Sequence, residues 1–193
     1  MTPIEQMVEL TGRQCGQCSL CCKVLRVIEL EKPENVWCDH CLPGHGGCSI
    51  HPTRPQICRG YYCGWMLSKT VTDEWYPLKS HMVLSIGAHH GLQTVTVTCD
   101  LNYPLAWREP PYYAQLKQMS ARGLKVAKQE DIHLVHVRSA GRVWLMLPNK
   151  DVEITTLSYV LKLVAKGEWD VELFASAEEA DARTHELSSP LAV

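Results

Sequence analysis

The feature that most constrains this chain is a series of cysteines in its first third. Cys15-Gly-Gln-Cys18-Ser-Leu-Cys21-Cys22 opens the series, and Cys38, Cys41, Cys48, Cys58 and Cys63 follow it. Nine of the ten cysteines therefore precede Trp65, and Cys99 stands alone. A Cys-x-x-Cys turn places two sulfurs on one side of a backbone reversal, where they can share an ion. Overlapping turns of this kind, repeated at 38/41, indicate metal coordination.

We predict nine metal ligands: Cys15, Cys18, Cys21, Cys22, Cys38, Cys41, Cys48, Cys58 and Cys63. Their spacing does not choose the metal. The first three match three ligands of a cubane iron–sulfur cluster, while the pairs 15/18 and 38/41 suit tetrahedral zinc. We expect zinc, with iron or an iron–sulfur cluster as the alternative. Because neighbouring side chains of an extended backbone point to opposite faces, Cys21 and Cys22 predict two centres or one polynuclear centre.

A thiolate-rich centre also needs groups that offset its negative charge. Four thiolates around a divalent ion leave a surplus that nearby cations or backbone N–H groups must balance. Lys23, Arg54 and Arg59 adjoin cysteines and are the candidate cations, although a solvated surface position is equally expected for the two arginines. His40 and His51 could complete a mixed site. With cysteine in excess, we expect them to make local hydrogen bonds instead.

Composition limits the other functional classes. The chain has 193 residues, with 46% hydrophobic and 21% charged residues, as is ordinary for a soluble globular protein. A net charge of −2 disfavours nucleic acid or an anionic membrane as a partner. Glu5 and Glu9 stand where a secretory signal carries basic residues, and no apolar run approaches the ~20 residues of a membrane span. We expect a cytoplasmic protein whose partner is an unknown protein or small molecule. In a reducing compartment, dense cysteine favours metal over disulfides.

The order of expected elements predicts an α+β fold. An irregular cysteine-rich metal-binding module, residues 1–65, is followed by an α+β part packed on it, residues 66–187, and a tail, residues 188–193. The second part should hold a small, mostly antiparallel sheet with two or three helices.

Periodicity and turn residues place the individual elements. We expect helices from Thr2-Pro3 to Gly12 and over 112–122 with Gly123 as its stop, and a short helix over 155–166. We expect a strand over 23–30, hairpins pairing 81–86 with 92–98 and 132–137 with 142–147, and a last strand over 169–174. Residues 176–186 contain helix formers but few apolar residues.

Four blocks of the sequence resemble one known family. They are Cys15-x-x-Cys-x-x-Cys-Cys22, Trp37-Cys-Asp-His-Cys41, the stretch from Gly47-Cys48 to Cys58, and Tyr62-Cys-Gly-Trp65. Together they resemble the YkgJ, or CxxCxxCC, cysteine-cluster family, which is described as a zinc- or iron-chelating domain. The resemblance implies the same nine cysteines as ligands and Arg54-Pro55 as a structural signature. His51 stands where the family is expected to carry tyrosine, which implies that this position packs rather than ligates.

The hypothesis that follows is a metal-binding protein, zinc- or iron-chelating, of unknown cellular role. The alternative is an iron–sulfur redox protein or enzyme whose substrate pocket lies in the second half. A basic and aromatic surface around Arg59 and Tyr62 could bind nucleic acid, but the overall charge disfavours this. Such aromatic residues more often shield a metal site from water. We expect Cys99 to be an inert buried thiol.

Overall fold

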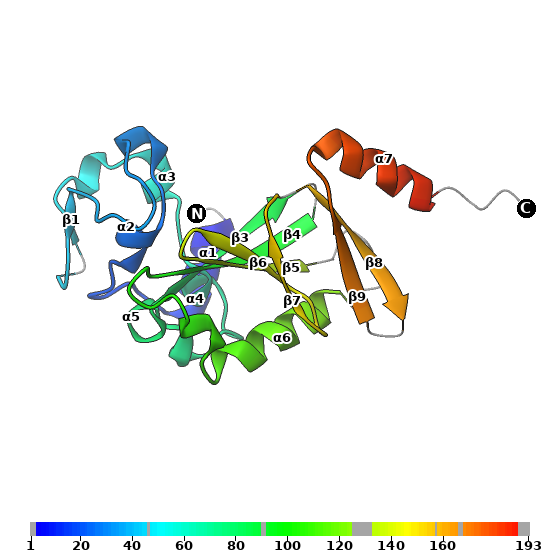
Figure 1. The fold of residues 1–193 in the computed structure, drawn as a ribbon. Helices are drawn as coiled ribbons and strands as arrows, with labels where there is room; N and C mark the ends of the chain where they lie inside the picture. The colour runs from blue at the N-terminus through cyan, green and yellow to red at the C-terminus, as the bar shows by residue number, and fades with distance from the viewer. Residues whose placement is uncertain are drawn as a thin grey trace, which may run out of the picture.

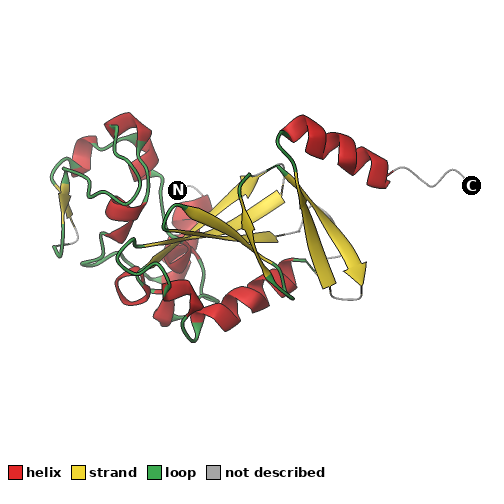
Figure 2. Cartoon of the chain, viewed as in Figure 1, coloured by secondary structure: helices red, strands yellow, loops and turns green. Residues whose placement is uncertain are grey.

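The computed structural model describes residues 3–45, 47–89, 92–124, 133–156, 158–165 and 168–188 (Figure 1). Within these ranges the chain forms seven α-helices and three sheets, so the predicted α+β fold is confirmed (Figure 2). Among the described helices, none combines the length and the apolar character that crossing a bilayer demands.

The cysteine-rich part consists of short elements, some of which lie at one end of the molecule and others beside the sheet (Figure 1). They are α1 (Pro3–Thr11), α2 (Leu20–Val24), a 3-10 helix (Ile28–Leu30), β1 (Cys41–Leu42), β2 (Gly47–Cys48), a 3-10 helix (His51–Thr53), α3 (Gln56–Arg59) and α4 (Gly64–Leu67). The N-terminal helix is confirmed by α1. Isolated helices of four or five residues are not stable in water, so contacts from outside each element must hold this part together.

The strand predicted over residues 23–30 is wrong. The first two of these residues end α2, and Ile28–Leu30 form a 3-10 helix that closes at Glu31 with φ of 50°. Leu20 and Val24 are four residues apart and therefore share one face of α2. Both are buried against Met66 and Val83. Packing on this face overrides the local β propensity of the apolar run.

The main sheet has five strands in the order β3-β4-β5-β6-β7. The strands are β3 (Met82–His89), β4 (Leu92–Cys99), β5 (His133–Ser139), β6 (Arg142–Met146) and β7 (Asp151–Ile154). All neighbours are antiparallel except β4 and β5, which are parallel. A parallel pair needs a crossover connection, and α6 (Tyr112–Gly123) supplies it on one side of the sheet (Figure 1).

Both predicted hairpins and the predicted helix over 112–122 are confirmed. Strand β3 runs on to His89, three residues beyond the predicted end, and residues 90, 91 and 132 lie outside the described residues. Ala140 and Gly141 make the second turn with φ of 50° and 76°. Tyr112 and Leu116 are buried on the apolar side of α6, as predicted. Strand β7 was not predicted.

The helix predicted over 155–166 is wrong, because β8 (Tyr159–Ala165) occupies this stretch and pairs with β9 (Glu168–Leu173). Tyr159 and Leu161 alternate along β8 and pack against the buried Leu134 and Leu145. The side chains of this stretch therefore alternate as in a strand, and the helical spacing of its apolar residues does not decide its structure. Residues 157, 166 and 167 lie outside the described residues. Strand β9 confirms the last predicted strand, and α7 (Ala177–Ser188) follows it.

The cysteine-rich part shares a core with the sheet. Leu20, Val24, Cys63 and Met66 pack together with Val83 of β3. Three short elements lie in the connections. A 3-10 helix (Asp73–Trp75) and α5 (Pro77–Ser80) lie between α4 and β3, and a 3-10 helix (Ala106–Arg108) precedes α6. The domain boundary after residue 65 stays a prediction.

Candidate metal centre

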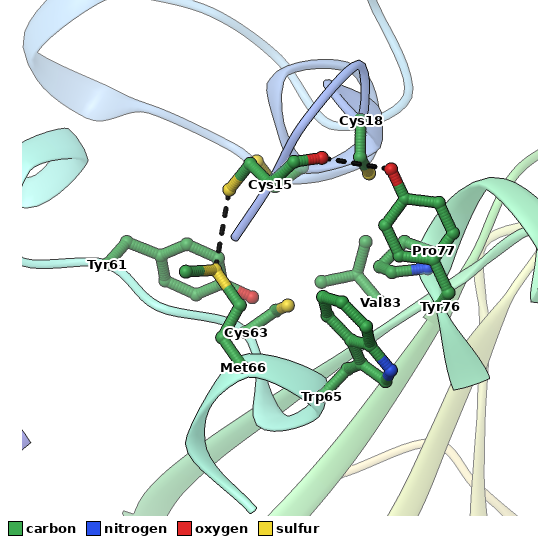
Figure 3. Close-up of a pocket in the computed structure, with 10 residues that line it drawn as sticks. Cys15, Cys18, Tyr61, Cys63, Trp65, Met66, Tyr76, Pro77 and Val83 are labelled. Carbon is green, nitrogen blue, oxygen red and sulfur yellow. Dashed lines mark hydrogen bonds between the residues drawn. The ribbon is translucent and has the colours of Figure 1, made fainter. Parts of the chain in front are cut away.

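Four of the nine predicted ligands line one small cavity of about 40 Å³. These four, Cys15, Cys18, Cys21 and Cys63, are called the first cysteine group. The other walls are Tyr61, Trp65, Met66, Tyr76, Pro77 and Val83 (Figure 3). The first two cysteines come from the loop after α1, the third from α2, and the fourth directly precedes α4. Three segments of the chain therefore supply sulfur to one cavity.

The loop that carries Cys15 is fixed by its own turn and by Tyr76. The Cys18 amide donates a 2.9 Å hydrogen bond to the Cys15 carbonyl, which closes the expected Cys-x-x-Cys turn. Gly16 takes the left-handed conformation there, with φ of 56°. The Tyr76 hydroxyl donates a second hydrogen bond to the same carbonyl at 2.9 Å. Although Cys15 is an exposed residue, its sulfur therefore faces the cavity.

Arg13 fastens this loop to α4 and to the segment that follows α4. Its guanidinium donates to the carbonyls of Trp65 at 2.7 Å and Ser68 at 2.9 Å, and it pairs with Asp73 at 2.8 Å. It also stacks over the Trp65 ring at 4.7 Å. Nothing in the sequence distinguishes Arg13 from other basic residues, so sequence analysis missed it.

The remaining five predicted ligands form a second cysteine group: Cys22, Cys38, Cys41, Cys48 and Cys58. The register of β1 and β2 sets Cys41 opposite Cys48. The Cys38 amide donates to the Cys22 carbonyl at 3.1 Å, and the Cys41 thiol lowers the pKa of Cys22. Nearby Cys22, Cys38 and Cys48 add to the burial that raises the pKa of Cys58.

The adjacent Cys21 and Cys22 belong to different groups. Cys21 lines the cavity of the first group, while Cys22 contacts Cys41 in the second. Their two thiols are hydrogen-bonded to each other. The groups therefore meet at this pair, an arrangement compatible with two neighbouring centres or with one polynuclear centre.

The thiols differ in their affinity for protons. Burial raises the pKa of Cys18 to about 11 and raises the pKa values of Cys15 and Cys63. The hydrogen bond between Cys21 and Cys22 raises the pKa of the former and lowers that of the latter to about 6. An ion entering the first group must displace protons, whereas Cys22 is already a thiolate at neutral pH.

Of the three predicted cations, only Arg54 acts on both groups. Its charge lowers the pKa values of Cys15 and Cys22, one from each group. Its Nε is buried and has no hydrogen-bond partner among the described residues. Arg59 is exposed, and the Lys23 ammonium pairs with Asp100 at 2.6 Å instead.

Lys32 is a buried cation that the sequence did not reveal. It is 5% exposed, and its ammonium donates to the carbonyls of Lys23 at 2.9 Å and Pro33 at 2.8 Å and to that of Leu25. Its charge also lowers the pKa of Cys22. Its neighbours in sequence, a glutamate and a proline, give no hint of this role.

Whether these residues fit a metal depends on their donors and charges. Within the described ranges, no three His, Cys, Asp or Glu side chains are already gathered closely enough to hold an ion. Binding would thus require the thiols of a group to close in. All donors of the two groups are sulfur atoms. The buried Nε–H of Arg54 has no hydrogen-bond acceptor among the described residues, and a metal-bound thiolate could serve as one. On both counts the residues fit a thiolate-bound metal.

Three other candidate donors lie outside the cavity of the first group. Cys99 ends β4 with 1% exposure, and burial raises its pKa to about 12. His51 is exposed, while His40 is partly buried. None of these three candidate donors faces the cavity of the first group.

Comparison of the chain with models of known families, with curated proteins and with solved structures found no match. The resemblance of the four cysteine blocks to the cysteine-cluster family therefore stays a prediction.

Proposed function

We propose that the protein binds metal ions through its two cysteine groups, as a zinc- or iron-chelating protein with zinc favoured. The observation that carries the proposal is the division of nine cysteines into sets of four and five. Each set supplies at least the four sulfurs of a closed tetrahedral zinc site. Such a site leaves no position open for substrate, so its role would be to hold the fold.

The short elements around the cysteines support this role. Between α1 and α5, the described helices and strands run from two to five residues. Helices of this length cannot persist by themselves. A metal bound by thiolates would supply the missing free energy, because ligation energy is folding energy in a small module. Arg54 and Lys32 would offset the negative charge.

Two serine variants test the proposal. Cys63→Ser removes one of the four sulfurs of the first group, and the double variant Cys41→Ser/Cys58→Ser leaves the second group with three. Each should lower the metal content of anaerobically purified protein to about half, with Cys99→Ser as the unaffected control. Full metal content in both variants would contradict the proposal.

A cavity in the second half favours one alternative, an iron–sulfur redox protein or enzyme. It measures about 410 Å³, within the usual range for small-molecule sites, and is lined by α5 and residues 103–112. Pro77 of α5 lines the cavity of the first group, while Lys79 and Ser80 line this larger one. Helix α5 would therefore separate a substrate bound in this cavity from the first cysteine group. Iron with acid-labile sulfide in the purified protein would select this alternative.

A further inference from the structure

Met66 gives the first cysteine group a fifth sulfur. Its thioether Sδ lies 3.4 Å from the Cys15 Sγ, as the dashed line in Figure 3 shows. Met66 follows Cys63 by three residues, and its amide donates to the Cys63 carbonyl at 2.9 Å, the same turn that joins Cys18 to Cys15. Cys63-Gly-Trp-Met66 is therefore a Cys-x-x-Met counterpart of the Cys-x-x-Cys turn.

The polar atoms of the other lining side chains are already used. The Tyr61 hydroxyl hydrogen-bonds with Ser85 at 2.9 Å, the Tyr76 hydroxyl donates to the Cys15 carbonyl, and the Trp65 indole donates to Asp73 at 3.3 Å. The described lining includes no carboxylate and no imidazole. Sulfur atoms are therefore the donors that this cavity offers.

Resting on the proposed metal binding but assigning this group an ion other than zinc, we propose that the first group binds Cu(I), with Met66 as a ligand beside the cysteine thiolates. Zinc is bound in proteins by thiolate, imidazole and carboxylate, whereas thiolate and thioether together suit soft Cu(I). Charge favours the same choice. A monovalent ion with two thiolates and a neutral thioether leaves a smaller surplus charge than zinc with four thiolates, and burying charge among apolar walls is costly.

The test is an anaerobic titration of the reduced, metal-free full chain with Cu(I), in competition with a chromophoric Cu(I) chelator. Met66→Leu keeps the side-chain volume but removes the thioether. Met82→Leu is the matched control, because Met82 is also buried but packs in the core cluster around Trp75. Met66→Leu should weaken Cu(I) binding by about tenfold or more and leave zinc binding unchanged. Equal Cu(I) affinity in both variants would overturn the inference.

A second measurement observes Met66 in the unchanged protein, and the variant serves only to assign its signal. The chain has six methionines, and ¹³C-methyl labelling gives each a separate NMR signal. The Met66 signal, assigned by its loss in Met66→Leu, should shift when Cu(I) is added and stay in place when zinc is added. A stationary signal with Cu(I) bound would overturn this inference alone. Failure to bind either ion would overturn the proposed function itself.

Discussion

Replacing Lys23 with methionine removes a buried charge that fastens α2 to the sheet. The Lys23 ammonium lies 2.6 Å from Asp100 Oδ1, and the two side chains are 11% and 8% exposed. Asp100 follows β4, while Lys23 directly follows Cys22. The pair therefore joins the helix that carries Cys21 and Cys22 to the end of a core strand.

The expected loss of stability is large. Methionine keeps the apolar stem of lysine but leaves the Asp100 carboxylate buried and unpaired, which costs about 3–5 kcal/mol. For a chain of 193 residues, each kcal/mol lowers the melting temperature by about 2–4 °C. The midpoint should therefore fall by about 6–20 °C.

Thermal unfolding followed by circular dichroism measures this change. Both proteins are kept reduced and loaded with the same metal, because bound metal shifts the midpoint through its own binding. Lys79→Met is the control, since Lys79 pairs with Glu74 on the exposed surface at 3.2 Å and should contribute little. If Lys23→Met lowers the midpoint no more than Lys79→Met does, the pair does not fasten α2.

Three further predictions concern the cysteine groups and the sheet. Arg54→Gln should lower the metal content and Arg59→Gln should not, because only Arg54 has a buried, unpartnered Nε and a charge that lowers the pKa values of Cys15 and Cys22; elemental analysis of both variants checks this. Gly123→Ala should cost about 3 kcal/mol or more in urea unfolding, since a Cβ would stand 2.2 Å from a β5 carbonyl oxygen. In metal-free protein at neutral pH, iodoacetamide should modify Cys22 far faster than Cys18, because their pKa values are lowered to about 6 and raised to about 11. Equal rates in peptide mapping would refute that order.

The sheet was the most predictable part of the fold. The alternation of Thr94, Val95 and Thr96 in polarity predicted a strand, although Thr94 itself is buried, and Gly141 marks the turn between β5 and β6. Helix α6 follows prolines and ends at Gly123, whose missing Cβ makes room for β5. In these places local propensity and tertiary packing favour the same structure.

Prediction failed where local propensity and packing disagree. Val24 belongs to an apolar, β-branched stretch, yet it is fully buried on a short helix because Val83 and Met66 lie against that face. Leu161 has neighbours at helical spacing, but β8 forms because β9 supplies a partner strand. In both cases the deciding contact comes from a distant part of the chain.

The sequence indicated which cysteines to consider for the candidate site, but not which of them lie together in each group. The spacing of the cysteines predicted nine ligands, and the adjacency of Cys21 and Cys22 predicted that these two side chains point in different directions. No spacing rule brings Cys63 to the cavity of Cys15, because α4 and β3 position it. Met66 and Lys32 were missed for the same reason.

The central claim is that the cysteine groups bind metal, and elemental analysis with a visible spectrum of anaerobically purified wild-type protein tests it most directly. The account predicts metal in proportion to two cysteine groups, about two ions per chain, without colour when the ions are zinc or Cu(I). Protein that is folded, fully reduced and free of metal, and that takes up none when zinc, iron or Cu(I) is supplied, would contradict it.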